Sequence, residues 1–432
     1  MADSPDPAAH GRPTFSAAEE HGFAMNKREF IAMMAAMMAL NALAIDSMLP
    51  ALPDIVRDLG VTNPNDRQLI VAAYLFMNGV GALFMGPLAD RFGRRPILLG
   101  AIAVYVLLAL GCALAGEFNL LIAMRAVQGF AAAATSVLVV AVIRDRYSGD
   151  RMASLMSTIF IVFLGVPVIA PSVGQLILYV ADWQAIFYLL AGLGLAVGLW
   201  VGLRLPETLR PADATPIRAS TLAASWSRVA TDRLGLGYIL CSAITIGALF
   251  GFINSGQQIF AEVFDAAAIF PYAFACVAGT MALANFFNSR IVERFGARRV
   301  SHLALLAYIA LSVAQVGAVL LFEGKEPLWL FLGLLAVNMS MVGFTGANFG
   351  SIAMEPFGHI AGAASAFQTF LRTAGGAAIG FAIGQMYDGT TLPLALGFLV
   401  AGLLALVILL WAEQGRLFTR PRRTGREPRP PR

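Results

Sequence analysis

The chain has 432 residues, of which 58% are hydrophobic and only 13% charged, with a mean hydropathy of +0.74 and a formal net charge of +4. These values exclude an ordinary soluble protein and indicate an integral membrane protein. No phosphate loop of the G-x-x-x-x-G-K-[ST] type, no Cys/His metal spacing and no G-x-S-x-G motif occurs. We therefore expect no enzyme, no metal site, no cofactor and no nucleic-acid partner.

Apolar runs of about 20 residues, the length needed to cross a bilayer core of about 30 Å, recur twelve times along the chain. Because each run is continuous rather than alternating in polarity, it predicts a helix and not a barrel strand. The runs lie near 28–50, 67–88, 97–115, 119–142, 155–180, 184–203, 234–256, 268–289, 300–321, 328–350, 361–386 and 392–411. The expected fold is all-α, with twelve transmembrane helices in two six-helix bundles.

Polar segments divide this pattern into parts. Residues 1–27 predict a disordered cytoplasmic leader, and 28–204 the N-terminal six-helix bundle. Residues 205–232, with three prolines and mixed charge, predict a cytoplasmic linker. Residues 233–412 form the expected C-terminal bundle, and 413–432 a basic cytoplasmic tail.

Basic residues fix the expected orientation. Of the 30 Lys and Arg residues, all but five lie on one side of the predicted helices. Arg57, Arg67 and Lys325 lie on the other side, and Arg125 and Arg372 lie inside spans. The positive-inside rule then places both termini in the cytoplasm.

A positively charged loop at 86–96 is repeated at 290–299. One constant offset aligns Asp90, Arg91, Phe92 and Gly93 with Glu293, Arg294, Phe295 and Gly296, as expected of two pseudo-symmetric halves. The second copy has Ala297 where the first has Arg94, so the halves are related and unequal.

Four motifs together resemble one known family over nearly the whole chain. Residues 86–96 look like the loop signature of the major facilitator superfamily, and 125–129 like the fourth-helix signature of its proton-coupled members. Residues 165–174 are similar to the fifth-helix signature of its twelve-helix antiporters. Residues 46–53 resemble the first-helix motif of the Bcr/CflA multidrug efflux group.

The resemblance implies a multi-pass protein of the bacterial inner membrane that exports antibiotics or other small organic compounds. It implies antiport with protons as the energy source, no cofactor, and a monomer in the lipid bilayer. A passive facilitator or importer of a metabolite, or a membrane sensor of the same fold, remains an alternative.

In that family the repeated loop latches the two halves in the outward-facing state, whereas a purely topological role is the simpler explanation. The residues expected to form this gating loop are Gly86, Asp90, Arg91, Gly93, Arg94, Arg95, Glu293 and Arg294.

Asp46 and Arg125 are the candidates for proton coupling. An ionisable group inside a span is costly unless it is paired, wetted or neutralised, so a carboxyl there can take up and release a proton. Counting residues from the outer helix ends puts both groups about 10 Å below that boundary, in one layer. Alternatively, Asp46 is merely hydrated near the outer mouth, and Arg125 with Gln128 only holds helices together.

The fifth span carries Gly165, Pro167, Pro171 and Gly174, which predict close helix contact and a bend in an antiporter helix. Its repeat partner, the eleventh span, carries three glycines at four-residue spacing. Both patterns suit halves that rock against each other, and static packing explains them equally.

Polar or aromatic residues deep in the spans are candidates for the substrate cavity, although each is equally suited to bond neighbouring helices. They are Asn41, Tyr74, Asn78, Gln257, Gln258, Asn285, Asn338, Asn348, Gln368 and Arg372. Arg372 departs from the resembled group, where a small residue is usual. As a cation it would attract an anionic or zwitterionic substrate, or pair with Asp46 or another acid.

Overall fold

The structure, a computed structural model, describes residues 25–147, 149–209 and 218–418. Within these ranges the chain forms helices and no strand. Most of the expected leader, part of the expected linker and most of the expected basic tail lie outside the described residues.

The first half of the chain contributes helices that each end at a polar or glycine-bearing loop. They are α2 (Lys27–Asp46), η1 (Leu49–Ala51), α3 (Leu52–Asp58), η2 (Pro64–Gln68), α4 (Leu69–Phe92), α5 (Arg94–Ala113), α6 (Phe118–Arg146), α7 (Gly149–Leu178) and α8 (Gln184–Arg204).

The second half repeats this order after a short helix. Its elements are α9 (Ala219–Thr231), α10 (Arg233–Glu262), η4 (Ala267–Ile269), α11 (Phe270–Phe295), α12 (Ala297–Leu321), α13 (Leu328–Met354), η5 (Glu355–Ile360), α14 (Ala361–Phe370), the π-helical turn η6 (Leu371–Gly375), α15 (Gly376–Gln385) and α16 (Leu392–Ala412).

Eleven helical segments in the described part of the chain are long and apolar enough to cross a membrane. The remaining predicted span, 361–386, is also helical, but the π-helical turn divides it into α14 and α15. Every predicted span therefore corresponds to helix, and the prediction of an all-α membrane fold is confirmed. The π-helical turn and helix α9, which lies within the expected linker, were not predicted.

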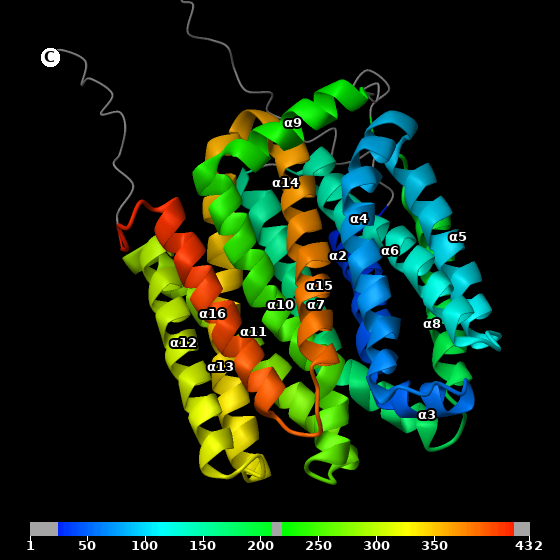
Figure 1. Cartoon of the computed structure of the whole chain (residues 1–432). Helices are drawn as coiled ribbons and strands as arrows, with labels where there is room; N and C mark the ends of the chain where they lie inside the picture. The colour runs from blue at the N-terminus through cyan, green and yellow to red at the C-terminus, as the bar shows by residue number, and fades with distance from the viewer. Residues whose placement is uncertain (1–24, 148, 210–217, 419–432) are drawn as a thin grey trace, which may run out of the picture.

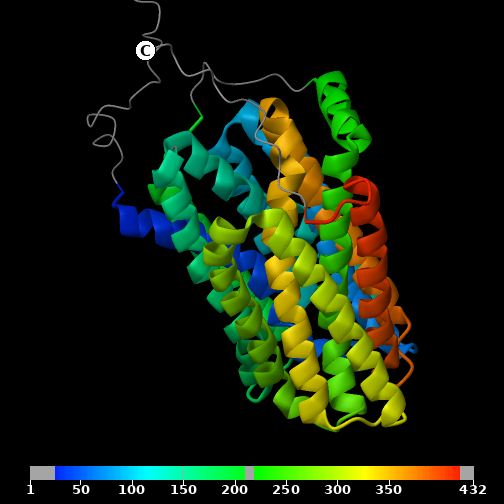
Figure 2. The same ribbon diagram turned by 90° about the vertical axis from the view of Figure 1, so that its left-hand side faces the viewer.

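The helices run side by side and form two sets, α2 with α4 to α8, and α10 to α16. In Figure 1, α5, α6 and α8 lie toward one side and α12, α13 and α16 toward the other, whereas α7 and α15 overlap near the middle. The view turned by 90° shows the same long, roughly parallel helices (Figure 2). We call these sets the N-half and the C-half. They meet where α4 packs beside α14 and α15, and where α7 packs beside α11.

The two ends of the bundle differ. Helix α9 and the last residues of α16 lie at one end, which we call the terminal end (Figure 1). Helix α3 lies at the opposite end, which we call the far end (Figure 1). Close packing joins α4 to α6 between these ends, because a methyl group on Gly129 would overlap the Tyr74 carbonyl.

Candidate functional site

Arg125 is fully buried and ties three helices of the N-half together. Its guanidinium donates to the Gln128 Oε1 at 2.8 Å and to the Ala44 carbonyl of α2 at 2.9 Å. It also lies over the Tyr74 ring of α4, 4.3 Å from the centroid. A cation held in this way by neutral acceptors and an aromatic face leaves its charge without an ionised partner.

Asp46 ends α2 and is only 5% exposed. Among the described residues it makes no ion pair, and Arg125 bonds to the carbonyl of Ala44, two residues earlier, instead. Two residues correspond to about 3 Å along a helix. The two charges thus occupy one layer of the N-half without touching.

Three of the expected cavity residues come together in the N-half. The Asn41 Oδ1 accepts a hydrogen bond from the Tyr74 hydroxyl at 2.8 Å and one from the Asn78 amide at 3.4 Å. The Asn41 amide donates to the Ser136 hydroxyl at 3.1 Å, and the Asn78 amide also donates to the Gly129 carbonyl at 3.2 Å. These three predicted residues form one polar cluster that joins α2, α4 and α6.

In the C-half, most expected cavity residues instead bond helix to helix. Asn338 is completely buried and donates to Ser312 at 3.0 Å and to Gln315 at 2.8 Å, joining α13 to α12. Asn348 donates to Asn288 at 2.8 Å, joining α13 to α11. These two residues are corrected from cavity lining to interhelical bonding, the alternative open to every amide in a membrane helix.

Asn285 and Gln368 bond to backbone. The Asn285 amide donates to the Met281 carbonyl one turn earlier at 3.1 Å, within α11. The Gln368 amide donates to the Gly350 carbonyl at 3.2 Å and so reaches from α14 to α13. Arg372, one turn after Gln368, lies in the π-helical turn.

The expected cavity residues Gln257 and Gln258 lie in a polar contact between the halves at the far end, which corrects their predicted place. Arg67 pairs with Glu262 of α10 and donates to the Gln257 Oε1 at 3.4 Å. Gln258 donates to the Asn65 Oδ1 at 3.0 Å.

The same contact continues between η2 and α15. Gln68 donates to the Gly384 carbonyl at 2.9 Å, and Gln385 donates to the Asn65 carbonyl at 2.8 Å. Asn65 in turn donates to the Tyr387 carbonyl at 3.0 Å. The sequence missed this contact, and its one signal was Arg67, a basic residue on the side with few of them.

The first copy of the charged loop is built around Arg94, which is 3% exposed. Its guanidinium pairs with Asp90 and, at 3.1 Å, with Asp145 at the end of α6. Glu207 accepts from the Arg94 and Arg95 backbone at 2.9 and 3.1 Å. The loop therefore joins the terminal ends of several N-half helices. Asp145 and Glu207 were not identified from the sequence.

Within this loop the other predicted residues differ in role. Gly93 has a φ of 100°, which favours glycine, and ends α4. Arg91 is exposed, 5.5 Å from the Phe92 ring centroid. Gly86 makes no close helix contact, because a methyl group there would meet nothing nearer than Val137 at 3.9 Å. The close contact in α4 is made by Gly79 against Ala374.

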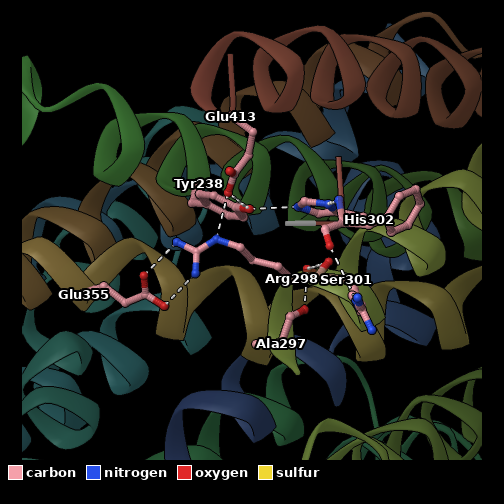
Figure 3. A network of polar contacts seen from close by, with 9 residues as sticks. Tyr238, Ala297, Arg298, Ser301, His302, Glu355 and Glu413 are labelled. Atoms are coloured by element: carbon pink, nitrogen blue, oxygen red, sulfur yellow. Dashed lines mark hydrogen bonds and ion pairs between the residues drawn. The ribbon is translucent and has the colours of Figure 1, made fainter. Parts of the chain in front are cut away.

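In the second copy of the loop, the buried arginine does not stand at the position aligned with Arg94. Arg298 is buried and pairs with Glu355 at 2.7 Å and with Glu413 at 2.9 Å (Figure 3). Glu293 and Arg294, the aligned residues, are exposed. These two predicted gating-loop residues lie on the surface, so their part in gating stays a prediction.

Tyr238 extends this C-half network. Its hydroxyl donates to Glu413 at 2.7 Å and lies 2.8 Å from the His302 Nε2 (Figure 3). The Phe418 backbone N–H donates to the other ring nitrogen of His302 at 3.1 Å. Each half thus gathers the terminal ends of its helices around one buried arginine.

The predicted antiporter helix α7 contains both prolines, but its two glycines are not alike. A methyl group on Gly174 would overlap the Ser47 carbonyl, so α7 approaches the end of α2 closely there. Gly165 faces open space within 4 Å, which corrects the expected contact at that position. The three glycines of the repeat partner all face near neighbours; these are Gly376, Gly380 and Gly384.

Two related sets of membrane-spanning helices, each with a charged loop at its terminal end, define a polytopic membrane transporter. The sequence profile described as Major Facilitator Superfamily matches residues 34–380. The chain belongs to this superfamily.

Relatives named for drug resistance support the efflux branch of the superfamily. The chain is 30% identical over 366 residues to a bicyclomycin resistance protein homolog of Haemophilus influenzae, covering 84% of this chain and 91% of the relative. It is 32% identical over 341 residues to a chloramphenicol resistance protein of Pseudomonas aeruginosa, covering 76% and 77%. It is 29% identical over 345 residues to the multidrug resistance protein MdtL of Salmonella paratyphi B, covering 78% and 83%.

A solved structure confirms the fold. The human organic anion transporter MFSD10 (TETRAN) superposes with a TM-score of 0.63 at 18% identity, over 89% of this chain and 99% of that one. At this identity the likeness concerns the fold alone. The predictions of a major facilitator fold and of a transporter rather than an enzyme are confirmed.

Proposed function

We propose that this protein exports antibiotics or related small organic compounds across the bacterial inner membrane in exchange for protons. The names of three relatives, which refer to bicyclomycin, chloramphenicol and multidrug resistance, support the direction and the kind of cargo. The observation that carries the proposal is Asp46, a buried carboxyl group without an ion-pair partner in the described structure.

Asp46 would bind the transported proton. Burial disfavours the charged carboxylate, so Asp46 takes up a proton when its surroundings are dry and releases it when substrate or water reaches it. Arg125 lies in the same layer and bonds to the same helix through Ala44. A movement of Arg125 that accompanies substrate binding would therefore be transmitted to the helix that carries Asp46.

The far-end contacts support an inward-facing conformation. With the basic loops at the terminal end taken as cytoplasmic, the far end faces outward and is closed by the pair of Arg67 and Glu262. Substrate then enters from the cytoplasm and displaces the Asp46 proton inward. Opening of the far end releases the substrate outside, where Asp46 is protonated again, and alternating access is complete.

The buried arginines of the two loops have a structural part in this cycle. Arg94 holds together the cytoplasmic helix ends of the N-half (28–204), and Arg298 holds together those of the C-half (233–412). Each half then moves as a unit. The proton gradient supplies the energy, and a monomer with no bound cofactor carries out the whole cycle.

The proposal is tested by proton release in everted membrane vesicles with an imposed proton gradient. Chloramphenicol and bicyclomycin, added in turn, should each evoke release of protons from energised vesicles and accumulate inside them. A facilitator would equilibrate the compound without accumulating it, and a sensor would do neither. Either of those results would overturn the proposal.

A further inference from the structure

Arg372 is a cation in the middle of a membrane-spanning segment. It is the second residue of the π-helical turn Leu371–Gly375, which interrupts the helix between α14 and α15. Single π-helical turns within α-helices occur frequently at functional sites. This turn packs against α4 of the N-half and α10 of the C-half, where the two halves meet.

The side chain of Arg372 belongs to the inward face of this helix. Gln368, one turn earlier, bonds to α13. Gly376, one turn later, packs so closely on α10 that a methyl group added there would overlap the Ile246 side chain. Residues four apart share a helix face, so Arg372 lies on the face that carries Gln368 and Gly376, and its side chain is exposed there. The exposed alanines Ala378 and Ala382 lie on a different face, which is left to lipid.

Arg372 has no counter-charge. Across residues 25–147, 149–209 and 218–418 the structure records no hydrogen bond or ion pair of its side chain, although the side chain is exposed. A guanidinium at this depth is costly unless an anion or water accompanies it. Arg125, by contrast, is fully buried and surrounded by acceptors. A free guanidinium fork suits a carboxylate, which it can bind in two parallel hydrogen bonds.

The turn lies at the depth of the polar cluster in the N-half. Ala374 packs against Gly79 so closely that a methyl group on Gly79 would overlap it. Gly79 follows Asn78, which is bonded to Asn41 and Gly129. Arg372 and the Asn41 cluster therefore lie in one layer of the molecule, on the two sides of the interface between the halves.

We propose that Arg372 binds the carboxylate of the exported compound, so that organic anions and zwitterions are substrates of this transporter. The amides of Asn41 and Asn78 provide hydrogen-bonding groups for the neutral part of the molecule. This inference rests on the proposed export function and specifies the chemical class of its substrate. The competing role, a cation that pairs with a protein carboxylate in another conformation, is an outcome of the test.

The test measures equilibrium binding to the purified full-length protein in detergent. The probes are nalidixic, salicylic and benzylpenicillin free acids, each paired with its methyl ester, and chloramphenicol serves as a neutral compound. The proteins are wild type, Arg372→Gln, Arg372→Lys, and Arg228→Gln as a control, because Arg228 is an exposed arginine of α9.

Wild type should bind at least one acid about ten times more tightly than its methyl ester, because the ester cannot form the charge-assisted hydrogen bond. Arg372→Gln should abolish this preference, Arg372→Lys should keep part of it, and Arg228→Gln should keep all of it. Binding of chloramphenicol by Arg372→Gln at the wild-type level would show that the variant is folded.

Equal binding of acid and ester by wild type, no binding of any acid, or a preference that survives in Arg372→Gln would each overturn the inference. If Arg372 instead pairs with a protein carboxylate, wild type would bind acid and ester equally. Export of chloramphenicol by wild-type vesicles is measured separately. Failure of that export with an intact acid preference would contradict the proposed function and leave Arg372 as an anion site.

Discussion

Arg67 and Glu262 form an ion pair between the N-half and the C-half, although they are 195 residues apart in the sequence. The Arg67 side chain is 5% exposed and the Glu262 side chain 45%. Gln257 accepts a second bond from the same guanidinium. Within the described residues, the bonds recorded for this nearly buried arginine all cross the interface, so closure of the far end depends on Glu262 and Gln257.

We therefore expect Glu262→Gln to open the far end. Loss of the charge leaves Arg67 with weaker acceptors, which costs about 1–2 kcal/mol and shifts the equilibrium toward the outward-open state about tenfold. Spin labels at Asn63 and Asp265, both exposed at the far end, report the change as a longer distance. The labelled protein needs Cys276→Ser, because Cys276 is the exposed native cysteine.

The control for this experiment is Arg57→Gln. Arg57 pairs with Asp54 within α3, and its side chain is 71% exposed, so its ion pair contributes little. Its distance distribution should match that of wild type. An unchanged distribution in Glu262→Gln would show that the ion pair does not keep the far end closed.

Arg298→Ala should destabilise the C-half. The substitution removes the ion pairs of Arg298 with Glu355 and Glu413, and removal of one partner from a largely buried network costs about 2–3 kcal/mol. Thermal unfolding in detergent measures the loss as a lower midpoint. Arg299→Ala removes the neighbouring exposed arginine and should change the midpoint little. Equal shifts in the two variants would contradict the structural role of the network.

Gly174→Ala should impair transport, whereas Gly165→Ala should not. The first methyl group overlaps the Ser47 carbonyl and forces α7 away from the end of α2, beside Asp46, while the second enters open space. Initial rates of chloramphenicol export, normalised to membrane-inserted protein, test the difference. Similar rates for the two variants would mean that the close approach of α7 to α2 is dispensable.

Asp90→Lys should lower transport without changing the amount of inserted protein. The new cation faces Arg94, which would then depend on Asp145 alone. Glu293→Lys is the matched control, because Glu293 is the aligned residue and is exposed. Loss of inserted protein in Asp90→Lys, measured by immunoblot of membranes, would favour a purely topological role of the loop.

Hydropathy and charge were sufficient to predict the spans, because only helices and closed barrels satisfy the backbone in lipid and continuous apolar runs exclude barrel strands. The interruption of the eleventh span by η6 was not predictable, since a π-helical turn depends on packing by neighbouring helices. The far-end contact of Arg67 and Glu262 was missed for a related reason. Each residue alone reads as an ordinary loop charge, and only the fold brings them together.

The repeated loop shows a limit of alignment. A constant offset aligns Ala297 with Arg94, yet the buried cation of the second copy is Arg298, one residue later. Both copies have a buried arginine in ion pairs, but at positions that the constant offset does not align. Similarly, an amide such as Asn338 has the same sequence signature whether it lines a cavity or bonds two helices, and only its neighbours distinguish the cases.

The central claim, that Asp46 couples proton entry to export, is tested most directly by chloramphenicol accumulation in energised everted vesicles containing Asp46→Asn. The asparagine keeps the size of the side chain and cannot carry the proton. Asp54→Asn, at an exposed ion pair of α3, is the control. We predict that Asp46→Asn is inserted normally and accumulates no chloramphenicol, while the control matches wild type. Uphill accumulation by Asp46→Asn at the wild-type rate would contradict the account.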